Sequence, residues 1–255
     1  MKKYTPKFFK DNLPEWKRKK DALITRYLYR PLSFVTASVC SNLGITANGI
    51  SYFSILIAIS ACILIALPNH ICNIIGAILV NIWLLSDCTD GNIARSVRKQ
   101  PFGEFADGIS SYILVGFLCT SLGIAAYFNS GLLIQKNCVW MVVLGAIASS
   151  SDTLMRLIYQ KYRSNERELA DKKIIRIEDD KRTNKEQTTS LLVRFELEFG
   201  VGGILPLIIL IGAILKAYDL VVMYCFMYYF FASIVMSLKY IRKAMKKAKE
   251  IEGDK

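Results

Sequence analysis

Residues 71–95 read ICNIIGAILVNIWLLSDCTDGNIAR, an apolar run that ends in two aspartates, a glycine and an arginine. Gly103 and Asp107 follow shortly after, so three carboxylates gather near one end of two apolar segments. Ionisable groups at the end of a membrane helix are costly unless they are paired or have a function. The pattern predicts a polar site built from Asp87, Asp90 and Asp107.

The rest of the chain is typical of a polytopic membrane protein. It has 255 residues, of which 53% are hydrophobic and 21% charged, so the charge must be segregated from the apolar segments. Six apolar segments are long enough to cross a bilayer: 48–67, 71–96, 103–128, 137–161, 195–216 and 220–240. The sequence predicts an all-α integral membrane fold with six transmembrane helices.

The flanking segments differ in composition. Aromatic residues interleave with Lys and Arg in residues 1–30, which predicts an amphipathic helix in the membrane interface. Turn residues are frequent at 31–47, and Thr46 or Asn48 is suited to N-cap the first spanning helix. We expect three parts: an N-terminal cytosolic or interfacial segment at 1–47, a membrane domain at 48–240 with a charged cytosolic loop at 162–190, and a basic cytosolic tail at 241–255.

The Lys and Arg residues are unevenly distributed. They gather in four segments, with ten in 1–30, three in 95–99, eleven in 156–194 and seven in 239–255. Only Lys136 and Lys216 lie elsewhere. By the positive-inside rule, both termini and the acidic site face the cytosol. The net charge of +12 then reflects topology and anionic membrane lipids, which argues against a nucleic-acid partner.

Helical spacing brings the motif residues together. Asp87, Asp90, Gly91 and Ala94 follow i, i+3, i+4 and i+7 and share one helix face. If the next helix packs alongside, its Asp107 lies close to Asp87 and Asp90. A cation is then needed to offset the repulsion between the three carboxylates. Carboxylate oxygens suit Mg²⁺, Mn²⁺ or Ca²⁺, and Arg95 favours an anionic substrate. A structural polar cluster and an ion pathway are the alternatives; the absence of an internal repeat and a site at one membrane face disfavour a transporter.

These residues resemble a known signature. The run D-x-x-D-G-x-x-A-R at 87–95, followed by G-x-x-x-D at 103–107, closely resembles the motif of the CDP-alcohol phosphotransferases. Thr46-Ala47-Asn48 is similar to the T-P-N of that family, with alanine in place of proline. The resemblance extends over roughly residues 30–240, although its specific motifs occupy much less.

The resemblance implies a reaction in which a CDP-alcohol, most often CDP-diacylglycerol, gives its substituted phosphate to a hydroxyl acceptor and releases CMP. Such reactions belong to phospholipid or envelope-glycan synthesis. Asp87, Asp90 and Asp107 would bind Mg²⁺ or Mn²⁺, with a catalytic role for Asp107. The implied nucleotide-binding residues are Gly91, Ala94, Arg95, Gly103, Thr46 and Asn48. Membrane lipids and a second copy in a homodimer are the further partners implied.

One position departs from the family pattern. The fourth aspartate of the signature, a metal ligand and general base, falls on Ser111, and the preceding run is one residue shorter than is common. A serine hydroxyl lacks the charge and the pKa of a base. Three interpretations stay open: one firmly held metal with another base, an acceptor that needs little base assistance, or a degenerate protein that binds CDP-linked ligands. Compensation by Glu104 is a further hypothesis.

The fourth apolar segment carries a second charged pair. Asp152 and Arg156 are spaced i, i+4, so they face the same way. A structural ion pair is one interpretation. The other is acceptor binding, in which Arg156 holds a phosphate or carboxylate of the acceptor.

Overall fold

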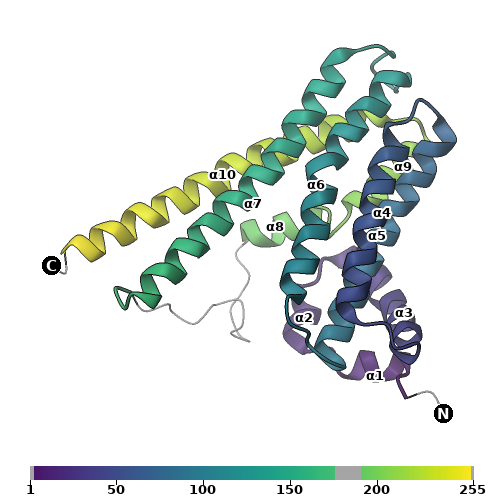
Figure 1. Cartoon of the computed structure of the whole chain (residues 1–255). Coiled ribbons are helices and arrows are strands. Elements are labelled where there is room, and N and C mark those ends of the chain that lie inside the picture. The colour runs from purple at the N-terminus through teal and green to yellow at the C-terminus, as the bar shows by residue number, and fades with distance from the viewer. Residues whose placement is uncertain (1–2, 176–190, 254–255) are drawn as a thin grey trace.

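The computed structural model describes residues 3–175 and 191–253, which form helices and no strands (Figure 1). The elements are α1 Pro6–Asp11, α2 Glu15–Lys20, the π-helical turn η1 Thr25–Tyr29, α3 Arg30–Asn42, α4 Ala47–Ala66, α5 His70–Ser96, α6 Gly103–Phe128, α7 Val139–Asp171, α8 Leu191–Phe199, α9 Leu205–Ile214 and α10 Tyr218–Gly253. Within these ranges, α4, α5, α6, α7 and α10 are long and apolar enough to span a membrane. The predicted all-α membrane fold class is therefore confirmed.

Three connections meet at one end of the bundle, which we call the turn end. The carboxylate of Asp219 accepts hydrogen bonds from the backbone N–H groups of 132–134, at 2.6–3.1 Å. The ring of His70 lies 3.0 Å from the Tyr218 hydroxyl. The loop 97–102 and the N-terminal helices lie at the opposite end, the motif end (Figure 1).

Small residues allow the spanning helices to pack closely. A Cβ added to Gly76 of α5 would lie 2.8 Å from the Ala61 carbonyl oxygen of α4. On α7, a Cβ at Gly145 would lie 2.3 Å from the Cys119 carbonyl oxygen of α6. Glycines at such crossings are typical of membrane helix packing. They bring α4 to α5 and α6 to α7, which positions the motif helix within the bundle.

The prediction of one helix over 195–216 is wrong, because the segment is broken between α8 and α9. A Cβ on Gly203 would lie 2.2 Å from the carbonyl oxygen of Glu198, so the tight turn there requires glycine. α9 has ten residues, which is about 15 Å of helix and about half of the hydrocarbon thickness. The chain returns to the turn end through two short helices instead of one span.

α7 and α10 are longer than the predicted 137–161 and 220–240. Helix therefore occupies the start of the predicted loop 162–190 and the tail as far as Gly253, while 176–190 lie outside the described residues. The two extensions run together away from the bundle (Figure 1). Buried Glu166 pairs with Lys247, and the Tyr162 and Tyr240 ring centroids are 5.3 Å apart. These contacts stabilise helices that the composition of each segment alone does not predict.

The N-terminal segment also differs from the prediction. The single amphipathic helix expected in residues 1–30 is divided into α1, α2 and η1; Pro14, which cannot continue a helix from α1, precedes α2. The turn-rich stretch 31–47 holds α3, with Pro31 in its first turn, where proline is tolerated. As predicted, Thr46 is the N-cap of α4 and accepts a hydrogen bond from a backbone N–H at 3.1 Å.

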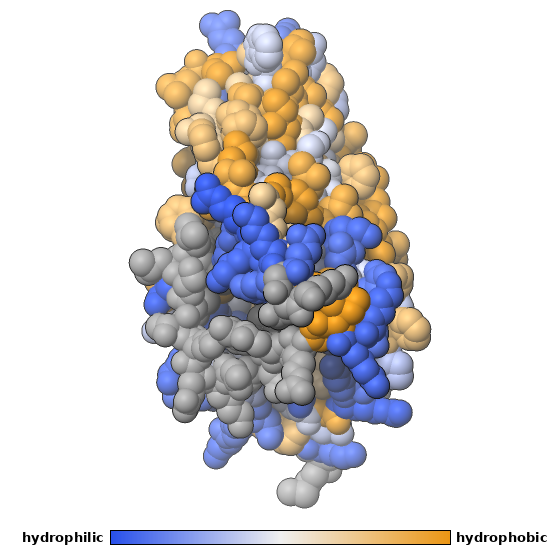
Figure 2. All heavy atoms as spheres, turned by 90° about the vertical axis from the view of Figure 1, so that its left-hand side faces the viewer, coloured by the Kyte–Doolittle hydropathy of each residue, from blue (hydrophilic) through white to orange (hydrophobic). Residues whose placement is uncertain are grey.

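Polarity divides the surface along the long axis of the molecule. Figure 2 shows apolar side chains dominating the upper part of one face, toward the turn end, and hydrophilic side chains gathered across the lower part. Exposed Phe53, Leu56 and Phe117 lie on spanning helices. Such an apolar band suits contact with lipid acyl chains.

Candidate active site

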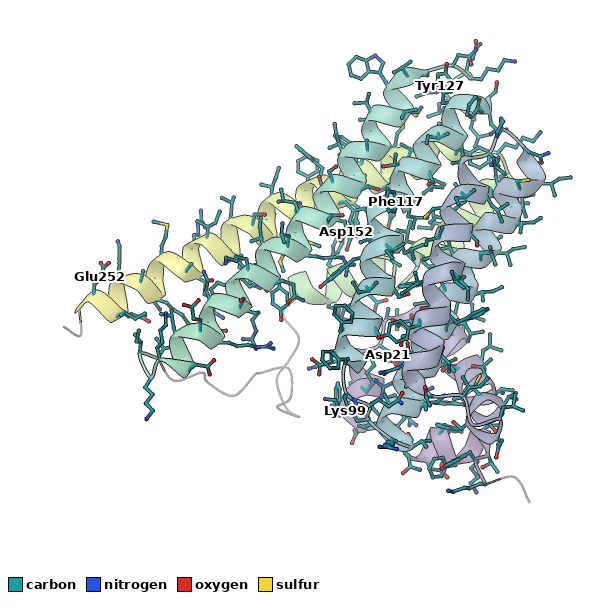
Figure 3. The ribbon with its side chains drawn as sticks, viewed as in Figure 1. Asp21, Lys99, Phe117, Tyr127, Asp152 and Glu252 are labelled. Atoms are coloured by element: carbon teal, nitrogen blue, oxygen red, sulfur yellow. The ribbon has the colours of Figure 1, made fainter. Side chains whose placement is uncertain are left out.

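The loop between α5 and α6 is tied to the start of α4. The backbone N–H of Asn48 donates to Gln100 Oε1 at 3.0 Å, and its side-chain amide donates to the Pro101 carbonyl oxygen at 2.9 Å. A Cβ on Gly103 would lie 3.2 Å from Asn48 Oδ1. The structure thus brings Asn48 and Gly103 together, with the N-cap Thr46 two residues away. Figure 3 shows Lys99 of this loop at the motif end and Tyr127 at the opposite end.

The three carboxylates lie beside one another at the motif end. Asp90 is buried, Asp87 is half-buried and Asp107 is exposed. The Asp87 carboxyl is within hydrogen-bonding contact of Asp107, and both of them act electrostatically on Asp90. Ser51 of α4 donates a 2.6 Å hydrogen bond to Asp90 Oδ2. Two helices, α5 and α6, therefore supply the carboxylates and α4 supplies a hydroxyl, and solvent reaches the cluster from the Asp107 side.

The donor chemistry of this cluster fits a hard divalent cation. All of its potential ligands are carboxylate oxygens, the type that Mg²⁺ and Mn²⁺ prefer. Cys88, on the same helix, is buried, and its backbone carbonyl oxygen accepts a hydrogen bond from Arg30. In the described ranges, no three His, Cys, Asp or Glu side chains form a preassembled metal cluster.

Arg95 folds back over the backbone of Gly91. A Cβ on Gly91 would lie only 2.9 Å from Arg95 Nη2 and 3.1 Å from Nη1. The same Nη2 donates to Asn92 Oδ1 at 3.3 Å. The absent side chain of Gly91 thus leaves room for a guanidinium beside the carboxylates. Ala94, in contrast, packs against the apolar cluster that joins α1, α3, α4 and α5.

Ser111 lies one helical turn beyond Asp107 and is half-buried. Its neighbour Ser110 is buried and is held by the indole N–H of Trp83 at 2.8 Å and by the hydroxyl of Ser54 at 2.6 Å. Two adjacent serines therefore have different environments. Ser110 belongs to the packing between α4, α5 and α6, whereas Ser111 is half-buried and shares the helix face of Asp107 by its i, i+4 spacing.

Sequence reasoning missed the polar residues of α4. Ser51 contacts Asp90 directly, and Ser54 contacts the helix that carries Asp107. Both are buried hydroxyls in an otherwise apolar run, spaced i, i+3. That spacing is the signal in the sequence, because polar side chains inside a membrane helix face partners rather than lipid.

The pair Asp152 and Arg156 is formed, with Arg156 Nε donating to Asp152 Oδ1 at 2.9 Å. Asp152 is 1% exposed and lies midway along the molecule on α7 (Figure 3). Below this pair, α6 and α7 enclose a polar pocket of about 590 Å³. Its polar lining includes Glu104, Tyr112, Gln160, Arg163 and Arg167, and it also includes Gly108, the residue after Asp107.

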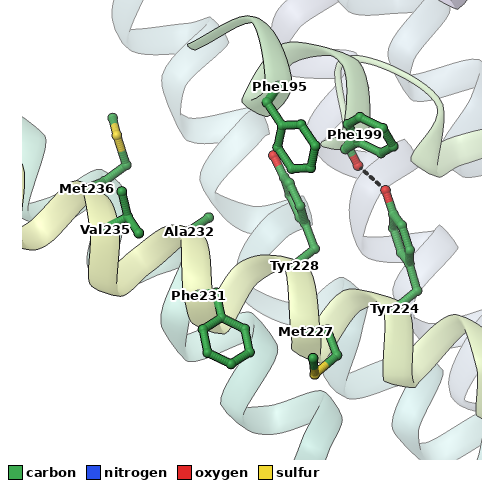
Figure 4. Close-up of a pocket in the computed structure, with 9 residues that line it drawn as sticks. All are labelled: Phe195, Phe199, Tyr224, Met227, Tyr228, Phe231, Ala232, Val235 and Met236. Carbon is green, nitrogen blue, oxygen red and sulfur yellow. Dashed lines mark hydrogen bonds between the residues drawn. The ribbon is translucent and has the colours of Figure 1, made fainter. Parts of the chain in front are cut away.

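A second pocket, of about 430 Å³, lies between α8 and α10 (Figure 4). Its lining is almost wholly apolar and aromatic, and includes Phe195, Tyr228 and Phe231. The Tyr224 hydroxyl closes one side by donating to the Phe199 carbonyl oxygen at 2.7 Å. The groove suits an acyl chain better than a polar group.

Fold and site together define a helical membrane protein with an acidic cluster and an arginine at one end of its bundle. Comparison with protein families gives the class a name: the CDP-alcohol phosphatidyltransferase family matches residues 44–241, and the chain belongs to it. The match includes the Thr46–Asn48 segment, both parts of the aspartate motif and most of α10. It confirms the resemblance seen in the sequence, and the family is one of transferases that act on CDP-alcohols. No curated protein matches the chain.

Proposed function

We propose that this chain transfers the substituted phosphate of CDP-diacylglycerol, or of another CDP-alcohol, to a hydroxyl acceptor and releases CMP, in phospholipid or envelope-glycan synthesis. The observation that carries the proposal is the cluster of Asp87, Asp90 and Asp107, in which Asp87 and Asp107 interact electrostatically with the Arg95 guanidinium. Acidic groups that can hold a cation and a basic group for phosphate oxygens are the two requirements of diphosphate binding.

The residues divide the work. Asp87, Asp90 and Asp107 would hold Mg²⁺ or Mn²⁺, which when bound neutralises diphosphate charge and favours departure of CMP. Ser51 fixes the orientation of the Asp90 carboxylate. Arg95 donates to phosphate oxygens of the donor. Thr46, Asn48, Gly91 and Gly103 would form the surface that the nucleotide approaches, whereas Ala94 packs against the apolar cluster behind it.

We place the acceptor in the polar pocket between α6 and α7. Arg156 lies one turn from Gln160, and Arg163 and Arg167 extend the same face of α7 along the pocket. This arginine face supports an acceptor that carries a phosphate or carboxylate. Asp152 orients Arg156 through their ion pair.

The membrane setting follows from charge and apolar surface. The motif end carries the loop 97–102 and the basic N-terminal helices, so we place it, with both termini, in the cytosol. The apolar groove between α8 and α10 supports a lipid donor, because it offers a place for an acyl chain. We retain a homodimer as the working assembly.

A second candidate rests on one observation, the serine at position 111. In this candidate, the protein lacks the fourth carboxylate, binds CDP-linked ligands and does not turn them over. CMP release by the purified protein in lipid bilayers separates the two candidates. We expect release with CDP-diacylglycerol in the presence of Mg²⁺ or Mn²⁺. Nucleotide binding without release from CDP-diacylglycerol or any soluble CDP-alcohol would establish the second candidate.

A further inference from the structure

The buried side chain of Arg30 bridges the N-terminal segment and the motif helix. Its Nε and Nη2 each donate to a different carboxylate oxygen of Asp21, at 2.8 Å. Its remaining Nη1 donates to Asn92 Oδ1 at 3.1 Å and to the Cys88 carbonyl oxygen at 3.3 Å. Arg30 is 5% exposed and Asp21 is 6% exposed. A planar guanidinium can make all of these contacts at once, which an ammonium cannot.

Asn92 carries this contact to the site. Its Oδ1 accepts from both Arg30 and Arg95, and its Nδ2 donates to Ser33 Oγ at 2.8 Å. Asn92 is 1% exposed, so its orientation is set by these three partners. The guanidinium over Gly91 is thereby connected, through one shared oxygen, to the buried ion pair of Arg30 and Asp21.

The N-terminal segment is itself anchored at several points. The Thr25 hydroxyl donates to the Gly202 carbonyl oxygen at 2.6 Å, and the Leu23 N–H donates to Glu198 Oε2 at 2.8 Å. Tyr29 hydrogen-bonds Asn81 of α5. The π-helical turn η1 precedes Arg30, and such turns are frequent at functional sites, where they redirect side chains. These hydrogen bonds fix the segment that carries Arg30 to the rest of the molecule.

We infer that Arg30 is a positioning residue for the transfer reaction: through Asn92 it holds the Arg95 guanidinium over Gly91, where Arg95 meets the donor diphosphate. The inference rests on the proposed function, because it assigns Arg95 to the donor. Arg30 itself is buried and does not touch substrate. Its effect is therefore specific to the donor and disappears when Arg95 is absent.

A double-mutant cycle tests this inference. Arg30→Lys, Arg95→Ala and the double variant would be compared in bilayers for donor KM, acceptor KM and CMP binding with Mg²⁺. We expect Arg30→Lys to raise the donor KM and weaken CMP binding by about tenfold, with the acceptor KM unchanged. In the Arg95→Ala background, Arg30→Lys should cause little further change in the donor KM or in CMP binding, since the effects of coupled residues are not additive.

Two further variants keep the result interpretable. Arg18→Lys makes the same exchange at an exposed position of α2 and should match the wild type. Asn92→Ser removes the relay and leaves the ion pair, and should reproduce the donor effect if Arg30→Lys does not fold. Additive effects, or equal changes in donor and acceptor KM, would overturn the inference. Failure of the proposed function would look different: the wild type would release no CMP from any donor.

Discussion

The Ser51 hydroxyl of α4 donates a 2.6 Å hydrogen bond to Asp90 Oδ2 of α5. This contact joins the first spanning helix to the carboxylate cluster and fixes the one member of the cluster that is buried. The backbone N–H of Gly91 also hydrogen-bonds the Asp90 carboxylate, so two contacts orient it. The orientation of Asp90 therefore depends on a residue outside the aspartate motif.

Ser51→Ala should lower kcat/KM by about tenfold and raise the Mg²⁺ concentration needed for half-maximal rate, because a hydrogen bond to a charged group is lost. Ser54→Ala is the matched control: it removes a buried hydroxyl one turn away that contacts Ser110. Metal titrations of initial CMP release measure both variants. An equal shift in the two would show that Ser51 acts through packing alone.

Gly91→Ala should raise the donor KM by about tenfold, because the new methyl group displaces the Arg95 guanidinium and weakens its phosphate contact. Helix propensity favours the substitution, so stability should not fall for that reason. Gly116→Ala is the control, since its Cβ would meet its nearest neighbour at an ordinary 3.8 Å. An unchanged donor KM in Gly91→Ala would show that Arg95 does not contribute to donor binding.

Ser111→Asp should raise kcat by about tenfold or more, because it supplies the missing carboxylate one turn beyond Asp107. Ser111→Asn introduces a side chain of nearly the same shape as aspartate but without its charge, and it should not raise kcat. Single-turnover CMP release measures the chemical step in both. A decrease in rate with Asp would mean that the site is built around the serine.

Arg156→Ala should raise the acceptor KM by about tenfold and leave the donor KM unchanged, because a charge-assisted contact to the acceptor is lost. Arg156→Lys keeps a charge beside buried Asp152 and separates this loss from damage to the ion pair. Steady-state kinetics with each substrate varied in turn provides the measurement. If the acceptor KM stays at the wild-type value, the pair is structural only.

The stability of the fold should depend on the ionisation of Asp21. Burial opposes ionisation, but the hydrogen bond from Arg30 and the charge of Lys17 together hold the pKa of Asp21 below its usual value. Because folding lowers this pKa, the ionised group stabilises the fold above its unfolded pKa of about 3.9. That contribution is lost as the pH falls through the folded pKa.

Asp21→Asn should therefore lower the thermal unfolding midpoint at pH 7, since it removes the ion-pair partner of buried Arg30, at a cost of about 3 kcal/mol. The difference from the wild type should shrink as the pH falls below about 4. Unfolding scans in detergent across this pH range measure the effect. If the difference in unfolding midpoint between the variant and the wild type did not depend on pH, the ion pair would not be its cause.

The sequence predicts helices α4, α5 and α6 well, because the signals that define them lie close together in the sequence. α4, α5 and α6 begin and end within one residue of the predicted bounds, because each apolar run is closed by turn residues such as Pro68 and Asn129. The aspartate spacing then places three carboxylates on facing helices. These features depend on residues that are close in the sequence, so local sequence patterns are enough to predict them.

The features that the sequence does not reveal depend on distant contacts. Glu166 and Lys247 are 81 residues apart, and their pairing extends α7 and α10 beyond the predicted spans. Arg30 and Asn92 are 62 residues apart, so no local pattern connects the N-terminal segment to the motif. The break before α9 has a visible signal in Gly200, Gly202 and Gly203, but its tight geometry is set by backbone packing.

The most direct measurement is metal-dependent CMP release from CDP-diacylglycerol by the purified protein in lipid bilayers, with Asp90→Asn in parallel. We predict release by the wild type with Mg²⁺ or Mn²⁺, none in the presence of a chelator, and a loss of at least about a hundredfold in Asp90→Asn, because a charged group at the reaction centre is removed. Release at the wild-type rate from Asp90→Asn would contradict the assignment of the active site.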